Sequence, residues 1–214
     1  MLSLKRGILI AIEGIDGSGK STLARTITSL LSNQQFPIVL TKEPGGTQLG
    51  ASVRAMLQEK PVPISSRTEF LLFAADRAQH MEQFVRPHLE KKYIVISDRM
   101  GDSSLVYQGY GRGLDKTMIK TINTWAMNNI QPDLTVYVKV DLDVALNRII
   151  ARNDKLTSFE QEKKDFFQRL IDGFDQIYTK RTDVICIDGN QPAKLCADDA
   201  YTKIVDWVNK SKLL

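Results

Sequence analysis

The sequence predicts an α/β fold, in which a five-stranded parallel sheet is flanked by helices on both faces. Short runs rich in β-branched residues alternate with longer segments of helical pattern along the chain, and this alternation is typical of strand–helix–strand crossovers. Most of the short runs are apolar throughout, as expected of strands that are buried on both faces. Because such sheets bind ligands at the carboxyl ends of their strands, the residues that follow each strand are the candidates for function.

The expected strands are, in chain order, the runs "ILIAIE" (8–13), "IVLT" (38–41), "YIVIS" (93–97), "LTVYVKV" (134–140) and "VICI" (184–187). The segments between and after them are long enough for crossover helices, which are expected at 20–32, 48–58, 67–90, 115–129, 143–152, 158–179 and 192–209. The last of these begins at Pro192, and proline is favoured at the first turn of a helix.

The bulk composition is that of a soluble globular protein, with 43% hydrophobic and 25% charged residues. The length of 214 residues predicts one domain, covering 1–214. Cys186 and Cys196 have no close ligand partner, so we expect neither a disulfide framework nor a zinc site, and a reducing compartment is favoured. His80 and His88 lack the i, i+4 spacing of a metal-binding helix, and a structural role, solvated or partly buried, is expected for both.

The sequence predicts a cytoplasmic protein. No apolar run approaches the ~20 residues that cross a bilayer, and the apolar N-terminal run leads into Glu13 without a cleavage-like site. The formal net charge is +4, but basic residues are scattered among acidic ones instead of forming a nucleic-acid-binding cluster. A pocket for small phosphorylated molecules needs the same positive excess, so the charge alone decides nothing. Because the basic residues are scattered and no apolar run is long enough to cross a bilayer, we expect neither nucleic acid nor a membrane as a partner.

A phosphate-binding loop follows the first expected strand. Residues 14–21, "GIDGSGKS", fit the pattern G-x-x-x-x-G-K-[ST] between a strand and a helix, as the mechanism requires. The glycines let backbone N–H groups turn inward, and the helix start adds the positive end of its dipole. Lys20 would reach the terminal phosphates and Ser21 would hold Mg²⁺. A glycine-rich turn without a ligand is the weaker alternative, and we expect a nucleoside triphosphate to be bound by Gly14, Ile15, Asp16, Gly17, Ser18, Gly19, Lys20, Ser21 and Thr22.

The third expected strand leads into the tripeptide "SDR". Asp98 stands where a carboxylate that anchors Mg²⁺ belongs in this class of fold, and Arg99 could clamp an anion. An ordinary surface Asp–Arg pair is the alternative, which the neighbouring phosphate loop makes the weaker one. Ser21 and Asp98 are therefore the expected metal ligands.

A second pocket is suggested by Phe73 and Arg77, which are four residues apart on one expected helix face. An aromatic plane beside a guanidinium group suits the stacking and hydrogen bonding of a base. The alternative is a core phenylalanine and an arginine that pairs at the surface with Glu69 or Asp76. The polar segment 147–164 is either a mobile cover over the phosphates or a solvated turn between two helices.

Other classes of nucleotide-binding protein fit the sequence less well. A GTPase switch would carry Asn/Thr-Lys-x-Asp after a late strand, whereas "TKRTD" (179–183) has one residue too many and precedes its strand. A motor or regulatory ATPase usually needs further domains or a polymer-binding surface. A small-molecule kinase needs a second pocket and a cationic cover, for which the chain has candidates.

Six motifs carry a resemblance to a known family: "EGIDGSGKST", "EPGGT", "LLFAADRAQH", "SDR", "SSLVYQGYGRGLD" and "EQEKKDFF". The order of "EPGGT", "DRAQH" and "YQG" is highly specific, and the sequence resembles bacterial thymidylate kinases almost end to end. The resemblance implies a P-loop kinase with a short lid, transfer of the γ-phosphoryl group of Mg-ATP to dTMP, and a homodimer. A kinase for another nucleoside monophosphate or a deoxynucleoside, and a regulatory P-loop ATPase, remain the alternatives.

The resemblance implies roles for residues near the sugar and phosphate of dTMP. Asp16 looks like the carboxylate that meets the 3′-hydroxyl group, and Tyr107 like the ring that crowds the 2′ position. Glu43 precedes a proline whose peptide bond is cis in such kinases. Arg54 and Arg99 resemble the pair that grips the monophosphate.

The resemblance also implies how the base is recognised. Phe73 resembles the residue that stacks on thymine, and Arg77 the residue that addresses its O4 atom. Ser104 and Gln108 fall where the family contacts the remaining edge of the base.

The sequence departs from the family at one position of the phosphate loop. Thymidylate kinases carry an arginine after the loop aspartate or supply arginines from the lid, and Gly17 occupies that position here. The lid, at about 148–160, must then contribute the cation, and Arg152 is expected to do so, with Lys155 as second choice. Arg148 is expected to pack against adenine. The expected catalytic residues are Lys20, Asp98, Arg99 and Arg152.

Overall fold

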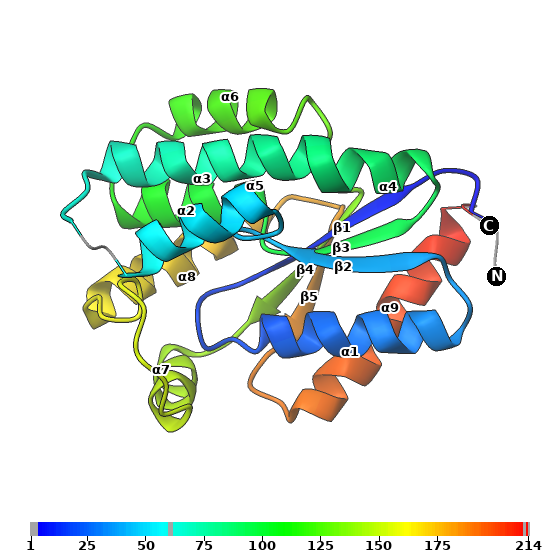
Figure 1. Ribbon diagram of the computed structural model, residues 1–214. Coiled ribbons are helices and arrows are strands. Elements are labelled where there is room, and N and C mark those ends of the chain that lie inside the picture. Colours follow the sequence, from blue (N-terminus) through cyan, green and yellow to red (C-terminus); the bar gives the residue numbers. More distant parts are fainter. Residues whose placement is uncertain (1–3, 60–61, 212, 214) are drawn as a thin grey trace.

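The computed structural model describes residues 4–59, 62–211 and 213. At its centre is a sheet of five strands in the order β2-β3-β1-β4-β5 (Figure 1). The strands are β1 (Ile8–Glu13), β2 (Ile38–Lys42), β3 (Ile94–Asp98), β4 (Leu134–Lys139) and β5 (Val184–Asp188). All neighbouring strands pair in parallel. The predicted fold class and the five predicted strands are therefore confirmed.

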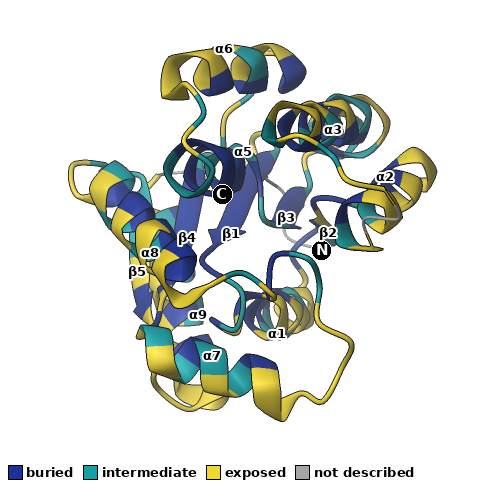
Figure 2. Ribbon diagram, turned by 90° about the vertical axis from the view of Figure 1, so that its left-hand side faces the viewer, coloured by how far each residue is buried: buried dark blue, intermediate teal, exposed yellow. Residues whose placement is uncertain are grey.

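Helices cover both faces of this sheet (Figures 1 and 2). The helical segments are α1 (Lys20–Asn33), α2 (Gln48–Glu59), α3 (Ser66–His80), η1 (Met81–Val85), α4 (Arg86–Glu90), α5 (Gly101–Ser104), η2 (Leu105–Gly111), α6 (Lys116–Ala126), α7 (Leu142–Ala151), α8 (Lys164–Tyr178) and α9 (Ala193–Lys210). Helices α1 and α9 pack together under one face, while α2 and α6 each pack on α3 over the other.

Strand β1 shows why the predicted strands are apolar throughout. Ile8, Ile10 and Ile12 pack into the core formed with α1 and α9. Leu9 and Ala11 point to the opposite face and pack with side chains of η1 and β3. Each of these five side chains is at most 1% exposed, because helices cover the strand from both sides.

The long helix predicted at 67–90 is one helical run with a π-helical insertion. Helix α3 begins after Ser65, whose hydroxyl oxygen accepts a hydrogen bond from the Thr68 amide at 3.2 Å. The π-helical η1 lies between α3 and α4. Pro87 in the first turn of α4 has no N–H group, so it cannot continue the α-helical bonding pattern, and the wider turn accommodates it.

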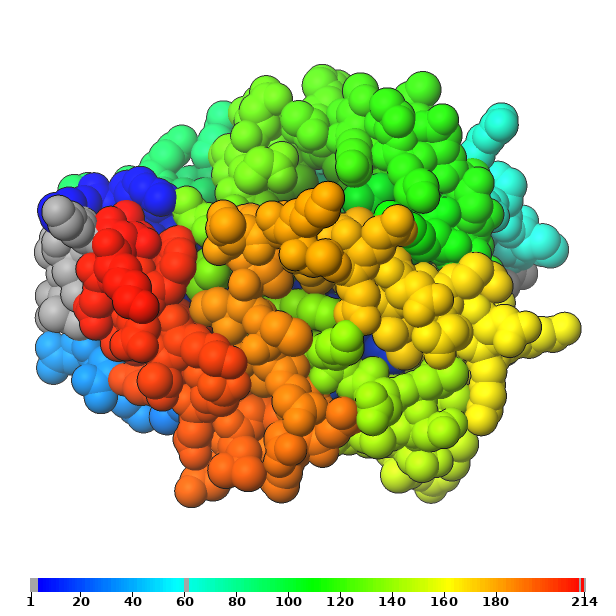
Figure 3. Space-filling view, turned by 180° about the vertical axis from the view of Figure 1, so that it is seen from behind, coloured from blue at the N-terminus to red at the C-terminus, as the bar shows by residue number. Residues whose placement is uncertain are grey.

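The helix predicted at 158–179 was wrong at its start, because α8 begins at Lys164. The residues before it cross from α7 to α2 instead. The Ser158 hydroxyl group donates to the Leu57 carbonyl oxygen at 2.9 Å, and the Ser158 amide donates to the Gln58 carbonyl oxygen at 3.3 Å. Seen from behind, the yellow segment after α7 and the cyan end of α2 lie at the same end of the molecule (Figure 3). Contacts between residues this far apart in the chain produce no local sequence pattern, so the sequence could not predict them.

The segment 101–111 is helical, although no helix was predicted there. It forms α5 and η2, and η2 packs against α8. Its three glycines, at positions 101, 109 and 111, disfavour a helix locally, so tertiary packing decides the conformation. In the described part of the chain, no helix is both long and apolar enough to cross a membrane.

Candidate active site

The loops at the carboxyl ends of β1, β2 and β3 line one cavity of about 750 Å³. Gly14, Ile15 and Ser18 do not line this cavity, but Gly14 and Ile15 hold Arg99 and Lys20 through their carbonyl oxygens. The other predicted site residues all line it: Asp16, Gly17, Gly19, Lys20, Ser21, Thr22, Glu43, Arg54, Phe73, Arg77, Asp98, Arg99, Ser104, Tyr107, Gln108, Arg148 and Arg152.

The phosphate loop has the backbone that its glycines predict. Gly14, Gly17 and Gly19 have φ angles of 151°, 79° and 94°, which L-residues with side chains rarely adopt. At Gly17 a Cβ atom would also lie 2.3 Å from the Ala145 carbonyl oxygen. An arginine at this position is therefore excluded by both the backbone and the neighbouring helix α7, unless both move.

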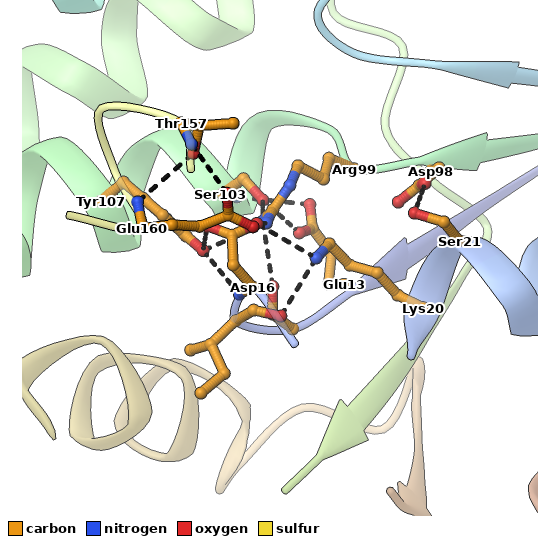
Figure 4. Close-up of polar contacts among 12 residues, drawn as sticks. Glu13, Asp16, Lys20, Ser21, Asp98, Arg99, Ser103, Tyr107, Thr157 and Glu160 are labelled. Carbon is orange, nitrogen blue, oxygen red and sulfur yellow. Dashed lines mark hydrogen bonds and ion pairs between the residues drawn. The ribbon is translucent and has the colours of Figure 1, made fainter. Parts of the chain in front are cut away.

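Lys20 begins α1 and is only 6% exposed. Its ammonium group donates to the Ile15 carbonyl oxygen at 3.0 Å and lies 3.6 Å from the Asp16 carboxylate (Figure 4). Burial lowers the pKa of Lys20, and Arg99 lowers it further, while Asp16 opposes both effects. The loop therefore places a cation among its own backbone groups, where it can bind a phosphate.

Asp16, Arg99 and Tyr107 form one hydrogen-bonded cluster beside this loop (Figure 4). Arg99 donates to the Asp16 carboxylate at 2.6 Å and to the Tyr107 hydroxyl oxygen at 3.1 Å, and the Tyr107 hydroxyl group donates to Asp16 at 2.9 Å. Burial alone would raise the pKa of Asp16, but Arg99 and Lys20 together lower it below its ordinary value. The carboxylate is therefore held ionised and can accept a hydrogen bond from a ligand.

The Ser21 hydroxyl group donates to one carboxylate oxygen of Asp98 (Figure 4). The other oxygen, Oδ1, is buried and has no hydrogen-bond partner among the described residues. A hydroxyl and a carboxylate oxygen are the hard ligands that Mg²⁺ prefers, and Mg²⁺ takes few protein ligands beside waters and phosphates. This pair is the part of the site that suits a divalent cation.

Glu13 was missed by the sequence analysis as a functional residue. Its buried carboxylate accepts hydrogen bonds from the Met100 amide at 2.8 Å and from both the amide and the hydroxyl group of Ser103. It thereby anchors the start of α5 and orients the turn at Arg99, whose φ is 73°. Its position at the end of β1, directly before Gly14, was the available signal.

Replacing Glu13 with glutamine is expected to stabilise the protein at pH 8. Burial, then the Asp102 carboxylate, raises the pKa of Glu13 from 4.5 to about 7. Between these values the folded protein holds a proton that the unfolded chain has lost, so wild-type stability falls as pH rises from about 4.5 to about 7 and then levels off. Glutamine keeps an acceptor for the amides and cannot ionise. Its advantage in free energy of unfolding should grow over this range towards at most about 3 kcal/mol.

Urea unfolding of both proteins from pH 5 to pH 8.5 measures this gap. Glu82→Gln serves as the control, because Glu82 is 51% exposed and pairs only locally with Arg86. A gap that does not change with pH would show that Glu13 is not the titrating group.

The "EPGGT" segment forms a turn held from two sides. The Glu43–Pro44 peptide bond is cis, as the resemblance implied. The Gly45 amide donates to the Asp76 carboxylate at 3.1 Å, and Arg54 donates to the Pro44 carbonyl oxygen at 3.0 Å. Burial, then the Glu43 carboxylate, raises the pKa of Asp76 to about 6. The turn therefore fixes Arg54 at the cavity wall.

Arg77 is 1% exposed and makes a buried ion pair with Glu43 at 2.8 Å. It also donates to Asn123 at 2.7 Å and to Ser104 at 3.1 Å. The alternative of a surface ion pair with Glu69 or Asp76 was wrong. Because Glu43 binds Arg77 and His80, its carboxylate holds other side chains in place rather than facing the cavity freely.

His80 bridges Glu43 and Thr41 through its two ring nitrogens, at 2.9 and 2.6 Å. It is fully buried, so the expectation of a solvated or partly buried side chain was wrong for His80. His88 is partly buried, with Nδ1 2.7 Å from the Phe84 carbonyl oxygen. Asn123 gave no sequence signal, and the "DRAQH" motif contains His80 without indicating its partners, because the partners of both residues are distant in the chain.

Phe73 lies at the cavity wall beside a residue of the lid segment, Phe159, with ring centroids 5.9 Å apart. Phe159 also packs edge-on against Tyr107 at 5.8 Å. Residues 152–163, which connect α7 to α8 and overlap the predicted lid at 148–160, are called the lid segment after that prediction. The segment therefore reaches the second pocket and Tyr107, which donates to Asp16 of the phosphate loop.

The lid segment also contributes charge to the cavity. Arg152 pairs with Glu160 at 2.7 Å and with Asp154 at 3.0 Å, and Lys155 is an exposed cavity residue. Arg148, on α7, donates to the Gly189 carbonyl oxygen at 2.7 Å and approaches the Ser18 carbonyl oxygen at 3.5 Å. Arg148 thus lies between the phosphate loop and the loop after β5.

Comparisons with known proteins show the family of this chain. The model of the thymidylate kinase family matches residues 12–200. The thymidylate kinase of Carboxydothermus hydrogenoformans is 43% identical over 172 residues, which cover 80% of this chain and 84% of that protein. That of Halothermothrix orenii is 36% identical over 201 residues, covering 93% and 97%. The crystal structure of thymidylate kinase from Ehrlichia chaffeensis matches with a TM-score of 0.75 and 32% identity, covering 93% of this chain and 99% of that chain. This chain belongs to the thymidylate kinase family.

Proposed function

We propose that this protein transfers the γ-phosphoryl group of ATP to dTMP, giving ADP and dTDP. The observation that carries the proposal is a single cavity that joins the phosphate loop to the pocket of Phe73 and Arg77. Two nucleotides can then meet with their phosphates over one edge of the sheet. The family of the chain and the names of its relatives support the same reaction.

The second pocket suits a thymine nucleotide. Arg77 lines the cavity and can only donate hydrogen bonds, so it suits an acceptor such as a base carbonyl oxygen. Phe73 offers an aromatic face for stacking. Arg54 and Arg99 line the part of the cavity nearer the phosphate loop and would bind the monophosphate, while Asp16 would accept the 3′-hydroxyl group.

We assign the metal site to Ser21 and Asp98. The unpartnered Asp98 oxygen described above suits a water molecule on a hydrated cation. When bound, Mg²⁺ would neutralise charge on the phosphate oxygens of ATP.

The chain's own cations would do most of the remaining work. Phosphoryl transfer spreads negative charge over the moving group, so catalysis depends on positioning and on fixed positive charge. Lys20 and Arg99 converge on the Asp16 carboxylate at one end of the cavity. No strong base is needed, because the acceptor is already an anionic phosphate oxygen. Closure of the lid would exclude water and prevent hydrolysis of ATP.

An assay of ADP formation tests the proposal. Mg-ATP is supplied with each nucleoside monophosphate in turn, with deoxynucleosides, and alone. Rapid ADP formation with dTMP and slow formation otherwise is expected. ADP formation that is independent of any acceptor would favour a regulatory ATPase, and preference for another acceptor would favour a different kinase.

Arg152→Ala is expected to lower kcat by at least about a hundredfold, because an arginine that contacts the transferred group stabilises its charge. Lys155→Ala is expected to change kcat by less than about threefold, since a lysine lacks the bidentate fork of arginine. Single-turnover measurements with saturating substrates compare the two. Equal and small losses would place the cation on the transferred group elsewhere.

We further propose that the protein is a homodimer through α2, α3 and α6, which lie together on one side of the molecule with exposed outer surfaces (Figure 2). These helices carry large apolar side chains that are at least half exposed: Leu49, Met56, Leu71, Met118 and Trp125. The pairs on α2 and α6 are each seven residues apart, so each pair shares a helix face. A second copy of the chain would cover this surface, as the family likeness implies.

Trp125→Glu is expected to convert the dimer to monomers at micromolar concentration, because it places a charge among these apolar side chains. Light scattering after size-exclusion chromatography gives the mass. Leu195→Glu is the matched control, since Leu195 is 53% exposed on α9, outside this surface. A dimeric Trp125→Glu protein would place the interface elsewhere.

A further inference from the structure

We infer that Glu69 is a positioning residue that determines which base the second pocket accepts, by fixing the orientation of the Gln108 side-chain amide. The inference rests on the proposed function, since it takes the pocket of Phe73 and Arg77 as the site of the acceptor base. It assigns a role to a residue that lies outside the cavity lining.

Two helical segments face each other across this pocket. On α3, Glu69, Phe73 and Arg77 are spaced four residues apart and therefore form one stripe. On α5 and η2, Ser104 and Gln108 are likewise four apart. The stripes are in register, because Arg77 donates to Ser104 at 3.1 Å and Gln108 donates to Glu69 at 3.0 Å. Along α3, Phe73 lies between Glu69 and Arg77, the two residues that make these hydrogen bonds.

The Glu69 carboxylate fixes the polarity of Gln108. A carboxylate only accepts hydrogen bonds, so the Gln108 amide must turn its NH₂ group towards Glu69. The Gln108 oxygen is left on the other side. It is buried and has no partner among the residues that the structure describes, although Gln108 lines the cavity. A buried acceptor of this kind is expected to be satisfied by a ligand.

Glu69 is itself held in place. It is 2% exposed, and Arg112 donates to its two carboxylate oxygens at 3.2 and 3.3 Å. Arg112 also donates to Glu162 at 2.6 Å and lies over the Phe166 ring at 4.8 Å from its centroid. The Glu69 carboxylate therefore cannot turn away from Gln108 without breaking a charged network.

The result is a donor–acceptor pattern on the pocket wall. Four of the five N–H groups of Arg77 donate to described residues, namely Glu43, Asn123, Met100 and Ser104, which leaves one N–H donor for the pocket. Gln108 presents an acceptor oxygen. The complementary base edge has a carbonyl oxygen next to a ring N–H group, as in a pyrimidine-2,4-dione such as thymine. Cytosine has an amino group and an unprotonated ring nitrogen at these positions, so both contacts would be mismatched. A site built for hydrogen bonding strongly rejects a ligand that leaves its buried polar groups unpaired.

The first test is Glu69→Gln, with kcat/KM measured for dTMP and dCMP. A glutamine at position 69 can turn either its oxygen or its NH₂ group to Gln108, so the Gln108 amide is no longer fixed. The ratio of kcat/KM for dTMP over dCMP is expected to fall by at least about tenfold, mainly through a higher KM for dTMP. The KM for ATP should be unchanged. Glu82→Gln, an exposed substitution on the same helical run, should leave the ratio as in wild type.

The second test exchanges the two groups, in the double variant Glu69→Gln with Gln108→Glu. The carboxylate now stands at position 108 and can again only accept a hydrogen bond from the base. The dTMP over dCMP ratio is expected to return to within about threefold of wild type. A role in packing alone would not be rescued by the exchange.

The outcomes separate the inference from the proposed function. A wild-type protein without dTMP-dependent ADP formation overturns the proposed function. A wild-type preference for dTMP that Glu69→Gln leaves intact, or that the exchange fails to restore, overturns only the role of Glu69. Partial unfolding does not obscure the result, because it lowers both rates in proportion and leaves their ratio unchanged.

Discussion

Lys20→Ala is expected to lower kcat by at least about a thousandfold, because it removes a fixed cation from the point where negative charge develops during transfer. In the structure the ammonium group lies between the Ile15 carbonyl oxygen and the Asp16 carboxylate. Both groups belong to the phosphate loop, so phosphate oxygens can replace them with little movement. Alanine leaves the loop without a positively charged side chain that can contact the transferred group.

The same variant is expected to remain folded. Burial already lowers the pKa of Lys20, which means that the protein environment disfavours its charge. Loss of the ammonium group should therefore change the melting temperature little, because Arg99 still pairs with Asp16 at 2.6 Å.

Steady-state assays with thermal unfolding in parallel measure both effects. Lys203→Ala is the control for activity, since Lys203 lies on α9 outside the cavity lining, where it pairs with Asp199 and donates to the Cys186 carbonyl oxygen. Near-normal turnover in Lys20→Ala would remove Lys20 from the catalytic residues. A large loss of melting temperature would instead mean that Lys20 acts through stability.

The phosphate loop could be predicted from sequence because its physics is local. Gly14, Gly17 and Gly19 are needed for positive φ angles, and their spacing is visible in the chain. The five strands could be predicted for a similar reason, since burial on both faces requires continuous apolar runs. In both cases the residues that form the recognisable sequence pattern are the same neighbouring residues that determine the local structure.

The remaining parts of the site depend on contacts between distant segments. Glu43, Arg77 and His80 form one buried group although Glu43 is more than thirty residues away in sequence. Ser158 donates a hydrogen bond to the end of α2, about a hundred residues earlier in the chain. The helix predicted from residue 158 therefore begins only at Lys164. Neither pairing leaves a periodic pattern, so only the folded structure shows which partner each side chain has.

Replacement of Arg77 is expected to affect stability and substrate recognition through separate causes. Arg77→Met removes the partner of Glu43, which is only 3% exposed and remains next to His80. Loss of one member of a buried ion pair costs about 3–5 kcal/mol, because the other charge is left uncompensated. The free energy of unfolding should fall by this amount. The KM for dTMP should rise at least about tenfold, since the base loses a donor.

The double variant Arg77→Met with Glu43→Gln separates the two effects. With no uncompensated carboxylate, its loss of stability should be smaller than that of Arg77→Met by at least about 2 kcal/mol. The KM for dTMP should stay high, because the donor is still missing, and the KM for ATP should be unchanged in both variants. Urea unfolding and initial-rate kinetics measure the two quantities.

Arg86→Met, which breaks exposed pairs with Glu82 and Glu90, is the control and should lower the free energy of unfolding by less than about 1 kcal/mol. If the double variant regained normal KM for dTMP, Arg77 would hold the pocket together without contacting the base, because restoring the packing alone would then have been enough.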